Sequence, residues 1–224
     1  KFLSIYYKNK SKGSGVALYV HESLNAVVNS DVSMVTGNLE SLFVTIDRES
    51  SPIHVGVIYR PPSGDNEKSL VELLDIMEKL PKCNVHVMGD FNINLHNSNS
   101  KLLHELENTM LGTGFSPIIS IDTHEKPGCK PSCIDNIFTN EIENTVSSGV
   151  LTLNVSHHHA IFQINSSMSS VIEKSDSKHT QFYDYSASNV EAFLVSINYE
   201  FNTNPPENFS GFNTAFHEQL NKVF

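Results

Sequence analysis

The sequence predicts an α/β domain, of the α+β or sandwich type, over residues 1–164, followed by a linker and a helical segment. Short runs rich in β-branched and aromatic residues, separated by turn residues, recur through this region. Two stretches with helical spacing interrupt the runs, and the sequence shows no internal repeat. This mixture is typical of β-sheets covered by helices.

The predicted strands are short, and loops rich in turn-forming residues separate them. Residues 8–15 form a polar, glycine-rich hairpin loop, and residues 49–52 close a second hairpin between two apolar runs. Each of these loops predicts an antiparallel pair of strands. Strands are expected at residues 2–7, 16–20, 24–28, 42–46, 53–59, 84–88, 133–138, 150–155 and 160–164.

Apolar residues at helical spacing predict two helices that pack against a sheet. The first helix ends before Pro81, and the second ends before Gly112 and Gly114, which suit a helix C-terminus. The apolar face of the first helix consists of Leu70, Leu73, Leu74, Met77 and Leu80, and that of the second of Leu103, Leu106 and Met110. Both helices are therefore expected to cover a sheet.

The composition changes after the last predicted strand. Residues 165–185 are rich in polar residues and poor in core-forming ones, which predicts a linker. Residues 186–224 are expected to be helical, with a capping box at Ser188–Glu191 and a second helix after Pro206. A strand is already under way at Phe2, and the last apolar stripe is still running where the sequence stops. We therefore expect a fragment that lacks its N-terminal part.

Charge and composition exclude several classes of protein. The chain carries 15 Lys and Arg against 25 Asp and Glu, a net charge of −10, so a nucleic acid must be bound at a local site. Only Arg48 and Arg60 offer guanidinium groups. No run approaches the roughly 18 apolar residues of a membrane span. Three cysteines and no visible signal peptide argue against a disulfide framework and favour a reducing compartment.

The most informative segment is residues 84–92, where a strand of buried type runs into Gly89-Asp90-Phe91-Asn92. Period 2 places Asp90 and Asn92 on one face and Phe91 on the other. Phe91 is expected to anchor the turn in the core while the carboxylate and the amide project from the sheet end. Gly89 is expected to let a ligand approach the backbone. The alternative is a turn rich in Asp and Asn without a chemical role.

Other segments place polar side chains at strand ends. Tyr59 and Arg60 end a strand just before two prolines, an arrangement that proline stiffening alone also explains. Asp135 lies in an otherwise apolar strand, where an ionised group needs a partner. The run Ser156-His157-His158-His159 precedes a further strand, so Asp135 can orient His158 in the way that carboxylates orient catalytic imidazoles.

In this order and at strand ends, these motifs resemble the endonuclease/exonuclease/phosphatase superfamily, and most closely the endonuclease domain of LINE-type (non-LTR) retrotransposon polyproteins. The motifs are Tyr59-Arg60-Pro61-Pro62, Gly89-Asp90-Phe91-Asn92, Ile134-Asp135-Asn136-Ile137 and Ser156-His157-His158. The flanking segments Gly15–Val20 and Phe138–Asn140 are also similar to that family. The resemblance covers residues 1–164, and the helical segment resembles the stretch that leads to the reverse transcriptase.

The resemblance implies a four-layer sandwich, in which two mixed β-sheets face each other between outer helices. It implies a hydrolase that cleaves phosphodiester bonds with Mg²⁺ or Mn²⁺ and nicks target DNA for reverse transcription. The implied partners are DNA and the reverse-transcriptase domain of the same polyprotein. Action on chromosomal DNA implies the nucleus, with the cytoplasm as the other location.

The resemblance also implies a role for each motif residue. Asp90 is expected to bind metal and activate the attacking water, with Asn92 and Tyr59 holding the phosphate. His158 is expected to stabilise the transition state, and Asp135 to fix its tautomer. Arg60 is expected to bind substrate.

Two departures from the family pattern keep other functions open. His157 occupies the position of a metal-site Asp, and neutral imidazole is a poor ligand for Mg²⁺. The metal-binding Glu of the family lies upstream of the first strand, and no carboxylate precedes Glu22. A phosphatase acting on small phosphoesters and a non-catalytic remnant or binding module are therefore alternatives. A zinc site at His124, Cys129 and Cys133 is a further reading, but the lack of a second cysteine pair favours a plain loop.

Overall fold

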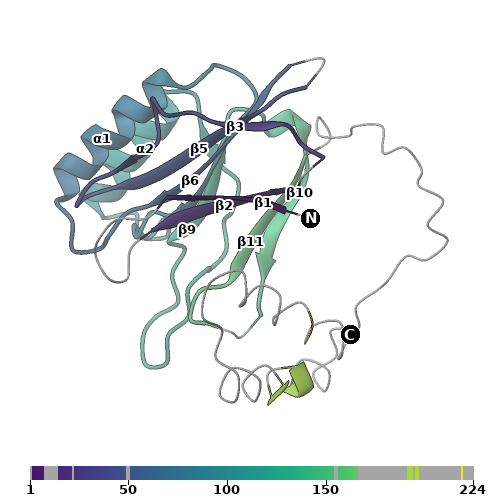
Figure 1. Cartoon of the computed structure of the whole chain (residues 1–224). Coiled ribbons are helices and arrows are strands. Elements are labelled where there is room, and N and C mark those ends of the chain that lie inside the picture. Colours follow the sequence, from purple (N-terminus) through teal and green to yellow (C-terminus); the bar gives the residue numbers. More distant parts are fainter. Residues whose placement is uncertain are drawn as a thin grey trace. The chain divides into compact units, whose positions relative to one another are not determined.

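The structure of the chain, a computed structural model (Figure 1), describes residues 2–7, 15–21, 23–48, 51–153, 156–165, 191–193, 195–196 and 218. The chain divides into two compact units, residues 1–170 and residues 171–224. The described residues of the second unit are helical. The rest of the predicted helical segment, and the predicted linker after Asn165, lie outside the described residues. In the described part of the chain, no helix is long and apolar enough to span a membrane.

A large mixed sheet forms the centre of the first unit. In the described residues it has seven strands in the order β3-β5-β6-β7-β9-β8, with β4 paired to β5. The strands are β3 (Ala26–Val28), β4 (Met34–Val35), β5 (Glu40–Ile46), β6 (Ile53–Tyr59), β7 (Val85–Asp90), β8 (Ser116–Pro117) and β9 (Asp135–Thr139). β6 and β7 are parallel, and the other pairs are antiparallel.

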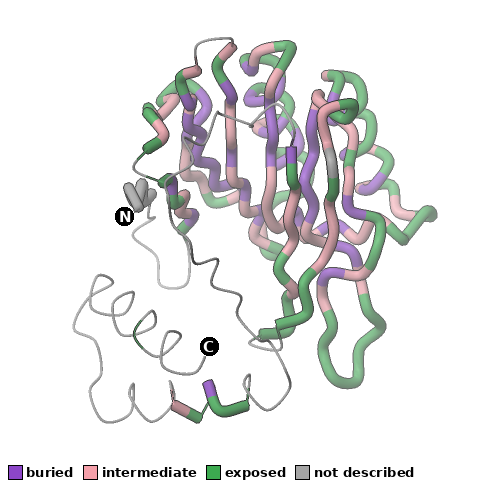
Figure 2. Tube along the Cα trace, turned by 90° about the vertical axis from the view of Figure 1, so that its right-hand side faces the viewer, coloured by how far each residue is buried: buried purple, intermediate pink, exposed green. Residues whose placement is uncertain are grey.

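Two helices cover one face of this sheet, as the apolar stripes predict (Figure 1). α1 (Asn66–Lys79) connects β6 to β7 and begins at Asp65, whose side chain accepts the N–H of Lys68. α2 (Lys101–Gly112) begins at Ser100, which accepts the N–H of Leu103 in the same way. The buried positions follow the central strands and the inner sides of the helices (Figure 2). The core between them includes Leu73, Ile76, Val85, Val87, Leu106 and Phe138.

Two hairpins form a second β layer, which packs on the other face of the large sheet. β1 (Phe2–Tyr7) pairs with β2 (Val16–His21), and β10 (Thr145–Leu151) pairs with β11 (Ala160–Asn165), both antiparallel. β2 packs against β5 and β6, and β11 packs against β9. The predicted arrangement of two facing β layers is therefore confirmed. In the described residues the second layer consists of two separate sheets, and α1 and α2 lie on one side of the large sheet.

The structure differs from the predicted elements at a few places. The strand expected at residues 150–155 is β10, which begins and ends earlier in the chain, at Thr145 and Leu151. The reason is that a polar segment containing Gly149 pairs with β11. β4, β8 and the 3₁₀ turn η1 (Ile142–Asn144) were not predicted, since two or three residues show no periodicity. The loop at residues 8–14 and the hairpin tip at residues 49–50 lie outside the described residues.

Candidate functional site

Three of the predicted site residues lie side by side in one row across the large sheet. Tyr59 ends β6 and pairs with Asp90 at the end of the parallel strand β7. β9 runs antiparallel to β7, so its first residue, Asp135, pairs with Asp90. Directly opposed residues on neighbouring strands point to the same face of a sheet. The topology thus brings Tyr59, Asp90 and Asp135 together where strands β6, β7 and β9 meet at one end of the large sheet.

His158 joins this row through Asp135. Its Nδ1 lies 3.2 Å from Oδ1 and 3.1 Å from Oδ2 of Asp135. The Asp135 side chain is 13% exposed and that of His158 is 41% exposed, so the imidazole lies at the mouth of the site. A carboxylate on Nδ1 fixes the proton on that nitrogen, which leaves Nε2 as the nitrogen that faces a ligand. The orientation predicted for His158 is therefore present.

A threonine in the loop before β9 holds Asp135 in place. Thr123 is fully buried, and its Oγ1 donates to Asp135 Oδ2 at 2.8 Å. The same hydroxyl accepts the backbone N–H groups of Ile134 at 3.1 Å and Asp135 at 3.0 Å. Asp135 is thus fixed from both its backbone and its side chain. Thr123 was not predicted as a site residue. It forms hydrogen bonds to residues that lie eleven and twelve positions later in the chain, and no local sequence pattern reveals such a contact.

Asp90 and Asn92 form the second half of the site. Asp90 Oδ1 accepts the backbone N–H of Asn92, and Oδ2 accepts its side-chain Nδ2, each at 2.9 Å. Asn92 adopts a left-handed backbone conformation with φ 50°, which asparagine tolerates better than most residues. Between them, Phe91 is 1% exposed and packs edge-on against Phe138, with ring centroids 4.9 Å apart. Phe91 thus anchors the turn in the core, as period 2 predicts.

The electrostatics of the row favour protonation of Asp90. Burial and then the charge of Asp135 raise its pKa to about 6, against the opposing hydrogen bonds from Asn92. Burial, followed by the charges of Asp90 and Glu40, raises the pKa of the Tyr59 phenol above its usual value. A carboxyl with a pKa near neutrality is suited to accept and return a proton at physiological pH.

The donor set of this edge fits a divalent cation. Asp90, Asp135 and His158 each offer one ligand atom, and these atoms all lie within 4.8 Å of one another. Carboxylate oxygens suit Mg²⁺ and Mn²⁺, and the imidazole nitrogen suits Mn²⁺ better than Mg²⁺. In the part of the chain that the structure describes, no other group of His, Cys, Asp and Glu comes together in this way.

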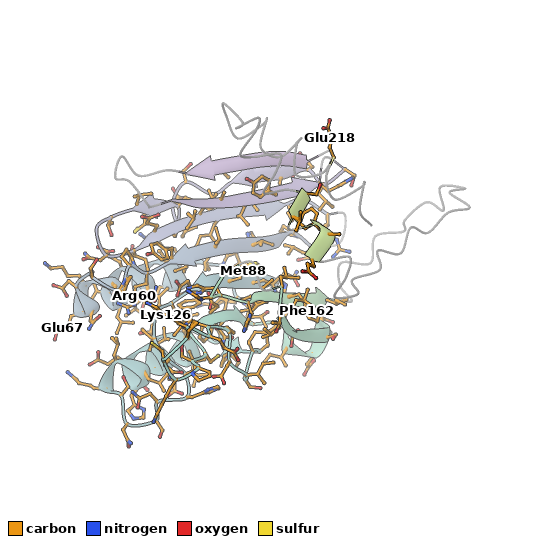
Figure 3. All side chains as sticks on the ribbon, turned by 90° about the horizontal axis from the view of Figure 1, so that it is seen from below. Arg60, Glu67, Met88, Lys126, Phe162 and Glu218 are labelled. Atoms are coloured by element: carbon orange, nitrogen blue, oxygen red, sulfur yellow. The ribbon has the colours of Figure 1, made fainter. Side chains whose placement is uncertain are left out.

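Arg60 supports the Asp90 turn from inside. It is 5% exposed, and its Nε donates to the carbonyl of Phe91 at 2.6 Å. Its Nη2 donates to the carbonyl of Asn92 at 2.8 Å, and its Nη1 to Oδ1 of Asn66 at 2.9 Å. Figure 3 shows Arg60 inside the molecule, whereas Glu67 of α1 points outward. We expected Arg60 to bind substrate, but these bonds use its guanidinium to hold the backbone on which Asp90 and Asn92 stand.

Comparisons with known proteins establish the fold. No protein-family model and no curated protein sequence matches the chain. Among solved structures, the endonuclease domain of TRAS1, a telomere-specific non-LTR retrotransposon, superposes with a TM-score of 0.63 at 17% identity, over 73% of this chain and 80% of that domain. An endonuclease/exonuclease/phosphatase family protein from Leptotrichia buccalis C-1013-b superposes with a TM-score of 0.54 at 16% identity, over 74% and 71% of the two chains. The chain has the endonuclease/exonuclease/phosphatase fold.

Within this fold, His157 stands apart from the group that could bind metal. Its side chain is exposed, and its ring centroid lies 6.4 Å from that of His124. His124, which follows Thr123, packs its ring 4.6 Å from that of His158. The zinc reading finds no support, because Cys133 is buried with its Sγ near the carbonyl of Ile119, while Cys129 is exposed in a loop. His124 instead forms one wall around the His158 ring.

Gly89 serves the sheet rather than a ligand. It has φ 145°, and a Cβ atom at this position would lie 1.8 Å from the carbonyl oxygen of Ile58 on the neighbouring strand. The expectation that Gly89 opens the backbone to a ligand is therefore corrected. Its role in the endonuclease/exonuclease/phosphatase fold of this chain is to let β6 and β7 approach just before they end in Tyr59 and Asp90.

Proposed function

We propose that this chain hydrolyses phosphodiester bonds in DNA with a divalent metal ion, as the endonuclease of a non-LTR retrotransposon. The observation that carries the proposal is the group formed by Asp90, Asp135 and His158 at one edge of the sheet. The fold likeness to the TRAS1 endonuclease domain supports DNA as the substrate. The net charge of −10 is consistent with binding at a local site rather than over a broad surface.

Each residue of the site has a role in this reaction. Asp90 accepts the proton of the water that attacks phosphorus and returns it to the oxygen that leaves as the P–O bond of the DNA strand breaks. Asn92 and Tyr59 hold the phosphate next to Asp90. His158, oriented by Asp135, donates from Nε2 in its imidazolium form to a phosphate oxygen on which charge develops. A divalent cation held by Asp90 would supply further neutralisation of that charge.

The proposal has consequences for partners and location. Nicking of target DNA pairs this unit with a reverse transcriptase, so we propose the reverse-transcriptase domain of the same polyprotein as its partner. Because the substrate would be chromosomal DNA, we propose the nucleus as the location of this step, with the cytoplasm as the alternative.

Nicking of a supercoiled plasmid by the purified chain tests the proposed function. Nicking is expected in Mg²⁺ and more strongly in Mn²⁺, with none in EDTA. Asp90→Asn and His158→Ala are each expected to lower the rate at least about a hundredfold. Asp75→Asn is the matched control, because Asp75 is an exposed carboxylate of α1 paired with Lys79 at 2.6 Å, and it should leave the rate unchanged.

The variant His157→Asp separates the alternatives. It adds a carboxylate beside His158, so a gain of nicking in Mg²⁺ is expected if the imidazole weakens the metal site. Hydrolysis of a small phosphomonoester, without nicking of the plasmid, would indicate a phosphatase. If folded wild type and His157→Asp turn over neither substrate, the non-catalytic alternative is supported.

A further inference from the structure

A buried carboxylate next to the site has no role in the proposed reaction. Glu40 is the first residue of β5 and is 1% exposed. It pairs directly with Tyr59, which pairs with Asp90, which pairs with Asp135. The row of site residues therefore extends to a fourth neighbouring strand. Tyr59 has a carboxylate on each side of it in this row, Glu40 on β5 and Asp90 on β7.

One contact explains only part of this placement. Glu40 Oε2 accepts the backbone N–H of Gly15 at 2.7 Å, which connects the segment before β2 to β5. A neutral glutamine oxygen accepts such a bond equally well, whereas burying a carboxylate that has no cationic partner among the described residues costs free energy. The titratable groups nearest to Glu40 in the row are a phenol and another carboxylate. A carboxyl group at such a buried position indicates a function that the fold alone does not require.

We propose that Glu40 is a positioning residue of this site, whose buried carboxylate fixes the Tyr59 side chain next to Asp90. The inference rests on the proposed function, because Tyr59 is there the residue that holds the phosphate. Because Glu40 and Tyr59 are directly opposed on neighbouring strands, their side chains lie on the same face of the sheet. The Tyr59 phenol, held at this position, can donate a hydrogen bond to a phosphate oxygen.

Two substitutions separate the charge of Glu40 from its contact with Gly15. Glu40→Gln keeps an acceptor for the Gly15 N–H and removes the charge, while Glu40→Asp keeps the charge on a shorter side chain. Glu72→Gln is the matched control, because Glu72 of α1 is half-buried, accepts from Thr36 Oγ1 at 2.7 Å and from Asn38 Nδ2 at 3.3 Å, and is not part of the row. Thermal unfolding of each variant shows whether it is folded.

A double-mutant cycle with Tyr59→Phe gives the first readout. Glu40→Gln is expected to lower the kcat for plasmid nicking by roughly tenfold to a hundredfold in the wild-type background, with partial recovery in Glu40→Asp. In the Tyr59→Phe background it is expected to have almost no further effect, because Glu40 acts through the phenol. Equal effects in both backgrounds, or an effect matched by Glu72→Gln, would overturn the inference and assign Glu40 to the fold.

Tyrosine NMR gives a second readout that needs no activity. In a chain with ¹³C-labelled tyrosine rings, the Tyr59 signal is identified by its loss in Tyr59→Phe. Glu40→Gln is expected to shift this signal, whereas Glu72→Gln should not. If Asp90→Asn abolishes nicking while Glu40→Gln changes neither kcat nor the signal, the inference alone fails. If wild type nicks no DNA, the proposed function fails and the NMR result decides the positioning of Tyr59.

Discussion

Strands β7 and β9 carry a pair of opposed polar residues at each end. One pair is a hydrogen-bonded donor and acceptor, and the other pair is two carboxylates. At one end His86 faces Thr139, and at the other Asp90 faces Asp135. His86 is 3% exposed, with Nδ1 3.0 Å from Thr139 Oγ1 and Nε2 3.4 Å from Asn165 Nδ2. The Thr139 hydroxyl donates to the carbonyl of Val85, so it accepts from Nδ1, and the ring is neutral. Burial accordingly lowers the pKa of His86.

The other end holds two groups of like charge instead of a donor and an acceptor. Burial and the neighbouring Asp135 raise the pKa of Asp90, and no cationic side chain lies between the two carboxylates in the row. The same two strands thus carry a satisfied neutral pair and a repelling acidic pair. The satisfied pair stabilises the fold, whereas the repelling pair destabilises it until a cation binds. This contrast distinguishes the Asp90 end of the strands as the candidate ligand site.

Gly89→Ala gives the largest expected effect, because it disrupts the strand on which both pairs depend. A Cβ atom would meet the Ile58 carbonyl at 1.8 Å in a backbone conformation with φ 145°. The loss of stability is expected to exceed about 4 kcal/mol, so that no cooperative thermal transition remains in circular dichroism. The matched control is Gly112→Ala, where an added Cβ meets nothing within 4 Å. A wild-type Tm for Gly89→Ala would show that β6 and β7 can separate without loss.

Arg60→Met tests whether the acidic end needs internal support. The substitution removes three donors, those to the carbonyls of Phe91 and Asn92 and to Oδ1 of Asn66. We expect a loss of about 3 kcal/mol in urea unfolding, together with weaker Mn²⁺ binding, because the Asp90 turn loosens. Lys68→Met, at a side chain that is 71% exposed, should change stability by less than about 0.5 kcal/mol. An equally small loss for Arg60→Met would mean that the guanidinium is free to serve a substrate.

Much of the fold could be predicted from the sequence, because its signals are local. β6 was predicted with the bounds that the structure has, since an apolar run ends there at two prolines. The apolar stripes placed α1 and α2 correctly within a few residues. β10 was misplaced, because its register depends on pairing with β11 and its own residues are mostly polar. The split of the second β layer also depends on contacts between distant segments.

The site was predictable to the extent that strand ends mark it. Period 2 at a strand end indicated Asp90 and Asn92, and a carboxylate within an apolar strand indicated Asp135. The structure brings these residues together with Tyr59 and His158. Thr123 was missed, because its bond to Asp135 depends on where a long loop crosses the sheet. Arg60 was assigned to the substrate, because a sequence does not show whether a guanidinium at a strand end turns inward.

His86→Leu tests the neutral end. It leaves the Thr139 hydroxyl and the Asn165 amide without their ring partner in a buried position. A loss of about 2 kcal/mol at pH 8 is expected, with unchanged Mn²⁺ binding at the acidic end. This loss of stability should shrink below about pH 6.5. The pKa of His86 is lowered in the fold, so the unfolded wild-type chain takes up a proton that the folded chain does not. Acid therefore destabilises wild type but has no such effect on His86→Leu. His104→Leu, at an exposed helix position, serves as the control.

Asp90→Asn gives the smallest expected change in stability, and its sign is opposite. The pKa of Asp90 is raised from its ordinary value of 3.8 to about 6 in the fold, so the folded chain binds this proton more tightly than the unfolded chain. Ionised Asp90 therefore destabilises the fold above about pH 6, and this penalty disappears as the pH falls toward 4. In EDTA at pH 8, Asp90→Asn is expected to be more stable than wild type by about 1 kcal/mol, after solvent screening is allowed for.

Mn²⁺ should reverse this order at pH 8, because the ion stabilises wild type through the carboxylates and has fewer ligands in Asp90→Asn. Urea unfolding of wild type and Asp90→Asn at pH 4 and at pH 8, each with and without Mn²⁺, measures these differences in stability. Acid therefore affects the two ends of the same strands in opposite directions, weakening the His86 end and relieving the Asp90 end. If Asp90→Asn lowers stability in EDTA at pH 8, Asp90 contributes to the fold in the same way as His86, and the contrast between the two ends fails.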